Sequence, residues 1–170
     1  MINGSGPGVD QLDVQLLDAL QRNGRSTFAE LGEIVGLKAA SVHERVKRLE
    51  ARGFVRGYTA RLDGRLLGLN LTAFVSCYTS AKMNYDEFNE AVAALPEVCE
   101  VHSVAGEESF ILKVMTKSTG ELDEFLSRLK KIEGIERTKT LIVLSTPFER
   151  GGIALREDGV PAARRLRSVR

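Results

Sequence analysis

The chain has 170 residues, 43% of them hydrophobic, which suits one ordinary domain or two small ones with packed cores. Its formal net charge is +1, so any affinity for nucleic acid must come from a local concentration of basic residues. No run of 18 apolar residues is present, which argues against a membrane-spanning helix. The opening MINGSGPGVDQLD lacks a basic and apolar leader, so we expect a cytoplasmic protein with a flexible arm over residues 1–9.

The two cysteines, Cys77 and Cys99, fit a reducing compartment. Both lie in apolar, strand-like patterns, and we expect both to be buried free thiols. Because no CxxC pair or His/Cys ligand cluster is present, we expect neither a metal site nor a cofactor.

Two short helices are expected before residue 36. A leucine stripe predicts the first, with Asp10 as its N-cap and Asn23-Gly24 at its end. The second is expected from Thr27 to Val35, capped by Ser26 or Thr27 with Glu30 completing a capping box. Gly36 then allows the left-handed turn that ends a helix. Helical spacing predicts one buried face in the second helix, made of Phe28, Leu31, Ile34 and Val35.

A third helix is expected at about 39–52, with a narrow apolar stripe at Val42, Val46 and Leu49. Residues 38–61 carry seven basic and two acidic side chains, whereas residues 10–37 have a net charge of −3. Positive charge concentrated on the second helix of such a pair is typical of a helix-turn-helix that faces DNA. The alternative is an ordinary amphipathic hairpin with a solvated charged face.

Side chains on the polar surface of this third helix are the candidates for DNA contact. Those expected at base edges are Ser41, His43, Glu44, Arg45 and Arg48. Those better placed for phosphates are Lys38, Lys47 and Arg52. Arg45 or Arg48 can bind guanine in a bidentate manner, whereas His43 also fits a merely solvated surface histidine.

The second part of the chain has a different character. Residues 54–62 suggest an extended hinge or wing strand, and turns at Asp63-Gly64 and Gly68 put a domain boundary near 61–66, so the helix-turn-helix domain covers 10–61. Over 66–150, strands and helices follow in the order βαββαβ. The expected strands are 71–80, 98–104, 109–115 and 136–149, and the expected helices are 84–95 and 119–134. The fold class is therefore α+β, with a ferredoxin-like sheet covered by two helices on one face.

The net charge of −4 over residues 66–150 makes this half a poor candidate for DNA contact. The uncovered face of the sheet is expected to expose Phe74, Ile142 and Leu144, and an exposed apolar face is typical of an interface, so we predict that this half dimerises. The tail, residues 151–170, carries five arginines against two acids. It fits either a solvated end or an auxiliary contact to DNA or a partner.

Several stretches together resemble the Lrp/AsnC, or feast/famine, family of prokaryotic transcription regulators. They span about Asp10 to Phe148 and are LDVQLLDALQRNGR, LGEIVGL, VHERVKRLEARGFVRGYTARLD, LG at 67–68 and HSVAGEESFILKV at 102–114. The resemblance implies a nucleoid-associated protein that binds double-stranded DNA as a homodimer, assembles further, often to an octamer, and responds to an amino acid. The βαββαβ unit would then be the effector domain.

The resemblance also implies an effector site at contacts between dimers. It lies near the loop that matches Val104, Ala105, Gly106, Glu107, Glu108 and Ser109. Gly106 would bring backbone N–H groups close to a carboxylate, and Glu107 or Glu108 would pair with an α-amino group. By residue type alone, the loop also fits a plain polar turn. Ser109 stands where many members have Asp, and Lys38 stands where the recognition helix often begins with a capping Ser.

We therefore expect a sequence-specific transcriptional regulator, and not an enzyme, that responds to a small molecule through oligomer assembly. One alternative is an enzyme resembling the sirohaem decarboxylases, which share this fold and bind a tetrapyrrole. Only His43 and His102 are present, in different domains, with no clustered acid/base pair. The other alternative is an architectural protein that coats DNA with little sequence preference.

Overall fold

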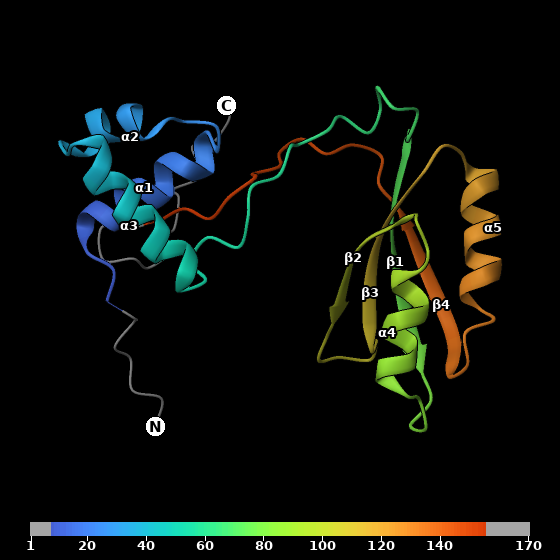
Figure 1. The fold of residues 1–170 in the computed structure, drawn as a ribbon. Helices are drawn as coiled ribbons and strands as arrows, with labels where there is room; N and C mark the ends of the chain where they lie inside the picture. Colours follow the sequence, from blue (N-terminus) through green and yellow to red (C-terminus); the bar gives the residue numbers. More distant parts are fainter. Residues whose placement is uncertain (1–7, 156–170) are drawn as a thin grey trace, which may run out of the picture. The chain divides into compact units, whose positions relative to one another are not determined.

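The computed structural model describes residues 8–155 and contains two compact units. The first comprises the residues up to Arg61 together with those from Phe148, and the second comprises Leu62–Pro147 (Figure 1). The expectations for residues 1–7 of the arm and 156–170 of the tail lie outside the described residues. None of the helices in the described part of the chain has the length and apolar character needed to cross a bilayer.

The first unit is built on three helices, α1 (Gln11–Arg22), α2 (Phe28–Val35) and α3 (Ala39–Ala51). Asp10 caps α1 and Thr27 caps α2, each in a complete capping box, which confirms Asp10 and selects Thr27 over Ser26. Gly36 ends α2 with a φ of 69°, as expected for a left-handed cap. By contrast, α3 begins after Lys38 without a side-chain cap, because an ammonium group has no lone pair to accept a bond.

The core of the first unit brings together apolar residues of all three helices: Leu16, Leu20, Leu31, Val35, Val42 and Val46. Two residues predicted to be buried on α2 are exposed instead, Phe28 at 40% and Ile34 at 58%. The buried face of α2 centres on Gly32, where an added Cβ would lie 2.4 Å from the Leu37 carbonyl oxygen, so Ile34 turns outward. Phe28 lies in the first turn, beyond the core, and its ring packs on His43 with centroids 5.0 Å apart.

The hinge segment after α3 is irregular, and the strand predicted there is wrong, since the structure assigns none between residues 54 and 70. Its first part packs back on the helices. Val55 contacts the core, and the Tyr58 hydroxyl donates to Glu50 Oε1 at 2.8 Å. The predicted turns do form at residues 64–68. Side-chain packing on the helical unit therefore replaces strand pairing over this segment.

The end of the described chain also belongs to the first unit. The backbone N–H of Ile153 donates to Gln21 Oε1 at 2.8 Å, and Gln21 Nε2 donates back to the Ile153 carbonyl at 3.2 Å. An ion pair of 3.1 Å joins Arg61 and Glu149. Residues 148–155 thus pack on the helical unit, although they follow the second unit in sequence.

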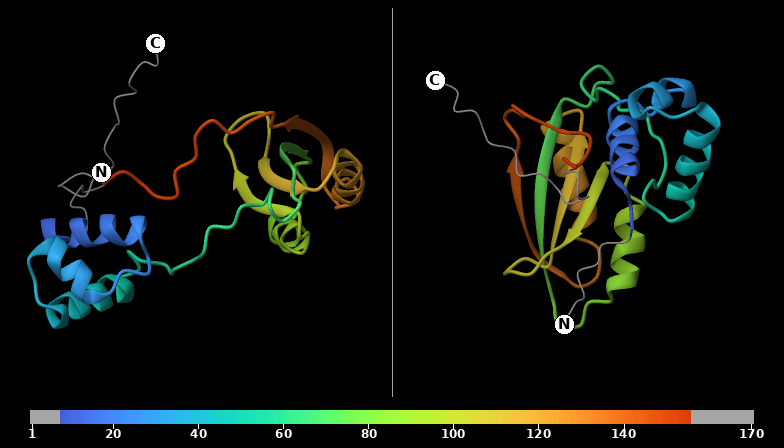
Figure 2. Two further views of the ribbon diagram at one scale, coloured as in Figure 1. Left: turned by 90° about the horizontal axis from the view of Figure 1, so that it is seen from above. Right: turned by 90° about the vertical axis from the view of Figure 1, so that its left-hand side faces the viewer.

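The second unit has the predicted βαββαβ order. Its elements are β1 (Leu71–Thr79), α4 (Tyr85–Ala93), β2 (Val98–Ser103), β3 (Phe110–Thr116), α5 (Thr119–Leu129) and β4 (Ile135–Ile142). The four strands form one sheet in the order β2-β3-β1-β4, and every pairing is antiparallel. The core lies between this sheet and both helices, which cover the same face (Figures 1 and 2). This confirms the ferredoxin-like α+β fold.

Alternation along β1 separates the two faces of the sheet. Ala73, Val75 and Cys77 are fully buried under the helices, whereas Phe74 points to the other face and is exposed, as predicted. Ile142 is exposed as predicted, at 48%, but it lies on the opposite face to the predicted one, because its register partner is Ala73 and paired residues share a face. Leu144 lies beyond the end of β4 and is 94% exposed.

The two cysteines differ in environment. Cys77 is buried in the core as predicted, and burial raises the pKa of its thiol to about 12. Cys99 is exposed, which contradicts the prediction, because β2 is an edge strand whose residues after Val98 are all exposed. A strand-like sequence pattern does not indicate whether the strand lies at the edge or in the centre of the sheet.

Candidate DNA-binding and effector sites

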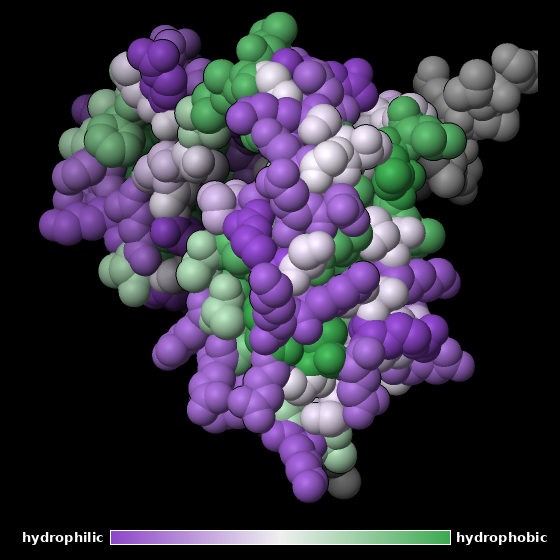
Figure 3. All heavy atoms as spheres, turned by 90° about the vertical axis from the view of Figure 1, so that its right-hand side faces the viewer, coloured by the Kyte–Doolittle hydropathy of each residue, from purple (hydrophilic) through white to green (hydrophobic). Residues whose placement is uncertain are grey.

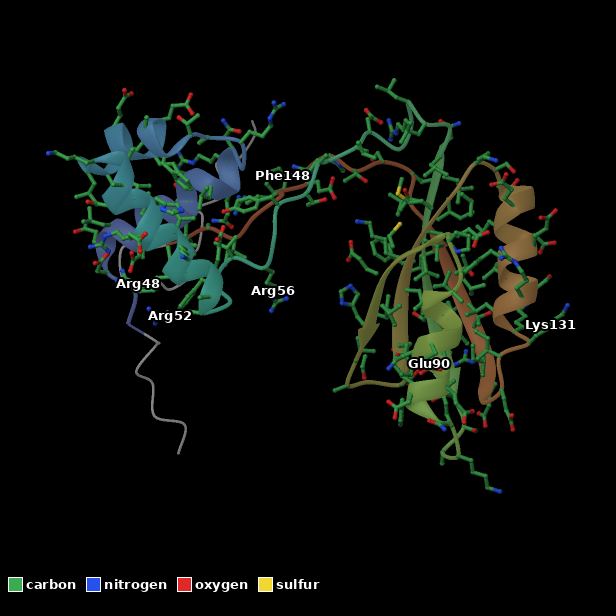
Figure 4. The ribbon with its side chains drawn as sticks, in the orientation of Figure 1. Arg48, Arg52, Arg56, Glu90, Lys131 and Phe148 are labelled. Carbon is green, nitrogen blue, oxygen red and sulfur yellow. The ribbon has the colours of Figure 1, made fainter. Side chains whose placement is uncertain are left out.

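Helix α3 presents a polar surface opposite the buried stripe of Val42, Val46 and Leu49. The candidates exposed on this surface are Lys38, Ser41, His43, Glu44, Lys47 and Arg48. Figure 4 shows Arg48, Arg52 and Arg56 following one another along one edge of the helical unit. The structure therefore brings basic side chains of α3 and of the segment after it to one side of the first unit.

Arg45 is the candidate that departs from this arrangement. Its guanidinium turns back toward α1, where Nη1 donates to Asp10 Oδ2 at 2.6 Å and to Asp13 Oδ1 at 2.7 Å. Only 23% of the side chain is exposed. These two bonds raise the pKa of Arg45, and the pKa of Asp10 is lowered first by the Asp13 N–H and then by Arg45. Arg45 thus joins α3 to α1 instead of projecting outward.

Arg48 and Arg52 keep more of their surface free. Arg48 Nη2 lies 3.6 Å from Asp13 Oδ1, and the side chain is 54% exposed. Arg52 Nη1 donates to the Gly8 carbonyl at 3.0 Å, and its guanidinium lies 4.9 Å from the centre of the Phe54 ring. Both arginines have further N–H donors, because a guanidinium carries five.

His43 lies at the border between α3 and α2. Its ring packs on Phe28, and Nδ1 lies 3.5 Å from Glu44 Oε1 of the neighbouring residue. The side chain is half exposed. The exposed part of His43 can contact a molecule bound against α3, while packing on Phe28 restricts the orientation of the ring.

The loop Val104–Ser109 connects β2 to β3 and is anchored at both ends. The Val104 N–H donates to the Ser109 carbonyl at 3.1 Å, and the Ser109 N–H donates to the Cys77 carbonyl at 2.9 Å. The Ser109 hydroxyl accepts from Thr79 Oγ1 at 2.7 Å. Between these anchors, residues 105–107 are exposed. Ser109 therefore ties the loop to β1.

The two glutamates of this loop differ. Glu108 accepts a hydrogen bond of 3.1 Å from the Tyr78 hydroxyl, and its pKa is lowered by its own backbone N–H first and by Tyr78 second. The Arg137 guanidinium lies 3.7 Å from the centre of the Tyr78 ring. Glu107 is exposed at the tip of the loop. Glu107 is therefore the carboxylate more accessible to a ligand.

Gly106 is not required by the loop geometry. Its φ lies outside the left-handed region, and a Cβ added there would meet only Glu108 Oε2, at an ordinary 3.6 Å. Any need for glycine at this position would have to come from a bound molecule.

Four residues that shape these surfaces are not identified by the sequence patterns. On α1, the patterns indicate only a capping role for Asp10 and no role for Asp13. On the sheet, Tyr78 and Arg137 lie opposite each other in the β1–β4 register. Their contact depends on the strand register, which pairs residues 59 positions apart and cannot be predicted from local sequence patterns.

The surface of the second unit over α5 is mostly polar. Figure 3 shows hydrophilic side chains dominating this view, with smaller hydrophobic areas between them. The open face of the sheet instead combines Phe74, Leu141 and Tyr78 with the charged residues Lys113 and Arg137. The apolar surface that suits an interface is thus on the sheet side.

Three helices that expose a basic third helix, followed by an acidic ferredoxin-like unit with an accessible loop, define a two-domain DNA-binding regulator. The family model of the Lrp/AsnC ligand binding domain matches residues 72–153, and that of the AsnC-type helix-turn-helix domain matches residues 9–50. The chain belongs to the Lrp/AsnC family of transcriptional regulators.

Relatives agree with this assignment. The chain is 35% identical to the HTH-type transcriptional regulator FL11 of Pyrococcus furiosus, over 83% of this chain and 93% of that protein. It is 36% identical to the HTH-type transcriptional regulator LrpA of Mycobacterium tuberculosis, over 81% and 91% respectively. These relatives are regulators, and the chain is a DNA-binding transcriptional regulator and not an enzyme of the sirohaem-decarboxylase kind.

Solved structures show the same fold. A transcriptional regulator from Neisseria meningitidis in complex with L-methionine superposes with a TM-score of 0.81 at 28% identity, covering 84% of this chain and 94% of that one. The feast or famine regulatory protein of M. tuberculosis complexed with L-methionine gives a TM-score of 0.78 at 35% identity, covering 84% and 96%.

Proposed function

We propose that this regulator recognises specific duplex sequences through α3. Exposed polar side chains approach base edges, namely Ser41, His43, Glu44 and Arg48, while Lys38, Lys47 and Arg52 bind phosphates. Arg45 is removed from the base-reading group, because both of its short hydrogen bonds hold it on α1. The exposure of Arg48 beside this restrained arginine is the observation that carries the proposal.

The proposed effector is an amino acid bound at the loop Val104–Ser109. Two structural neighbours are complexes with L-methionine, which supports this ligand class. We assign the α-ammonium group of the ligand to Glu107, since Glu108 already accepts a bond from Tyr78. The ligand carboxylate would meet backbone N–H groups around Gly106.

The proposed response works through assembly. We infer that the open sheet face forms a homodimer, that dimers associate further, with an octamer as the expected form, and that the loop lies at contacts between dimers. A ligand changes DNA binding only if it binds one assembly state better than another. A site shared between dimers provides that difference, and the spacing of the α3 helices changes with it. The protein would act in the cytoplasm on nucleoid DNA.

Selection from duplexes with a randomised central segment tests the DNA-binding part. The full chain is expected to enrich a defined sequence and to prefer it over a scrambled duplex at every salt concentration. Arg48→Ala should reduce that preference, whereas Lys47→Ala should weaken both duplexes alike. Equal affinity for the enriched and scrambled duplexes would instead identify a DNA-coating protein.

Sedimentation velocity tests the effector part. L-Methionine, followed by the other proteinogenic amino acids, is expected to shift the oligomer distribution of the wild-type chain, and Glu107→Gln should weaken that shift. Glu133→Gln, which removes an exposed carboxylate outside the loop, is the matched control. A distribution that no amino acid changes would refute the proposed effector class.

A further inference from the structure

Asp13 is the one charged residue within 8–155 that is buried, at 2% exposure. It lies in the first turn of α1, and its N–H donates to Asp10 Oδ1 at 2.8 Å as part of the capping box. A carboxylate withdrawn from water is costly unless cations and hydrogen bonds compensate it. Capping alone does not require such burial, since Glu30, which holds the equivalent position in the capping box of α2, is exposed.

The compensation for Asp13 comes from α3. One oxygen, Oδ1, receives Arg45 Nη1 at 2.7 Å and lies 3.6 Å from Arg48 Nη2. The two arginines are three positions apart, so both reach the same side of α3. A single carboxylate oxygen is therefore shared by a restrained arginine and an exposed one.

The shared contact affects the two arginines differently. Arg45 is also bonded to Asp10, and both of its contacts lie between the helices. Arg48 touches Asp13 through one nitrogen while more than half of its side chain remains exposed. Its remaining donors can meet a base edge, and an arginine whose guanidinium is restrained by an ion pair loses less entropy on binding.

We propose that Asp13 is a positioning residue for sequence recognition, which holds the Arg48 guanidinium in the orientation that reads a base. This inference rests on the proposed function, because it requires that α3 reads sequence. Asp13 itself does not touch DNA. It acts through Arg48, and Arg45 supplies the charge that allows the carboxylate to remain buried.

The test compares Asp13→Asn with Asp18→Asn in the full chain. Asp18 lies on the same helix and pairs with Arg22 on the surface, so its substitution removes an equal charge without touching α3. The probes are the duplex enriched by the wild-type chain and its scrambled counterpart. Asp13→Asn should lower the preference for the enriched duplex by about tenfold, as expected for a weakened arginine–guanine contact.

The affinity for scrambled DNA separates positioning from a merely structural role. Removing a carboxylate near basic side chains should leave this affinity unchanged or tighter, whereas partial unfolding would weaken both probes. Asp13→Asn and Arg48→Ala should relax selectivity at the same base pair, and the double variant should be no worse than Arg48→Ala alone. Selectivity lost at different base pairs, or a fully additive double variant, would overturn the proposal.

A second variant covers the case in which Asp13→Asn fails to fold. Asp13→Leu with Arg45→Met replaces the buried ion pair by apolar side chains, an exchange that proteins often tolerate, and leaves Arg48 in place. We expect it to be folded by circular dichroism yet to have lost selectivity. Wild-type selectivity in this variant would show that Arg48 needs no carboxylate. If the wild-type chain enriched no sequence, the proposed function would fail first, and this inference with it.

Discussion

Replacing Arg45 by alanine should destabilise the helical unit, although the residue lies on the recognition helix. The substitution leaves Asp13 buried with a 3.3 Å hydrogen bond from the Asp10 N–H and one cationic partner, Arg48, at 3.6 Å. Removing one partner of a buried ion pair costs about 3–5 kcal/mol. Since 23% of the Arg45 side chain is exposed and Asp10 can regain water, we expect about 2 kcal/mol in the free energy of unfolding.

For a unit of this size, 2 kcal/mol corresponds to a decrease in Tm of about 10 °C. Thermal unfolding followed by circular dichroism, with hydrogen exchange at the amides of α1 and α3, would assign the loss to the first unit. Arg22→Ala is the matched control, because it removes an exposed pair with Asp18 four positions away and should cost well under 1 kcal/mol.

A wild-type Tm for Arg45→Ala would refute the reasoning, since it would mean that Asp13 needs no compensating charge. The result also determines how a loss of DNA binding in this variant is interpreted. Loss of DNA binding in Arg45→Ala together with a lowered Tm would report unfolding of the unit, and not the loss of a base contact.

Three further predictions concern packing, the thiols and pH. Gly32→Ala should cost about 1–3 kcal/mol, because the added Cβ meets the Leu37 carbonyl oxygen at 2.4 Å, and chemical denaturation measures this. A thiol reagent should label one cysteine in the native protein, Cys99, and two after denaturation, as mass spectrometry would show, since Cys77 is buried with a pKa raised to about 12. The pKa of Asp10 is lowered below 3.8 in the folded state, so its contribution to stability is fully present above that pH and is lost as pH falls. Asp10→Asn keeps the cap and should flatten the loss of stability in acid.

Each of these predictions has a contrasting outcome. Gly106→Ala has open space and should leave stability unchanged, so equal losses at both glycines would contradict the packing argument. Labelling that persists in native Cys99→Ser would show that Cys77 is accessible. If the stability of Asp10→Asn fell in acid as steeply as that of the wild type, Asp10 would not contribute to the pH dependence of stability.

The features predicted correctly from sequence are those fixed by neighbouring residues. The N-caps at Asp10 and Thr27 and the left-handed Gly36 depend on groups within four positions, and the structure contains all three. The order of strands and helices follows from apolar periodicity, which is also local. The Lrp/AsnC resemblance joined these pieces into the correct fold.

The features missed depend on pairings between distant parts of the chain. The position of Arg45 follows from the packing of α3 on α1, which no pattern within α3 reports. The face of Ile142 follows from its register with Ala73, and the exposure of Cys99 from the edge position of β2. The Tyr78–Arg137 contact beside the loop has the same origin. For the candidate sites, the sequence predicted which segments matter but not which side chains are already engaged.

The return of the chain to the helical unit after β4 has a practical consequence for dissecting this regulator. A fragment ending at Arg61 would lack the Gln21–Ile153 and Arg61–Glu149 contacts, so it should melt below the intact protein. Two chain segments lead from the second unit to the first, one before β1 and one after β4. They start from paired strands, since the Val143 N–H donates to the Thr72 carbonyl at 2.9 Å. Both covalent connections to the helical unit therefore leave the second unit beside one hydrogen-bonded strand pair.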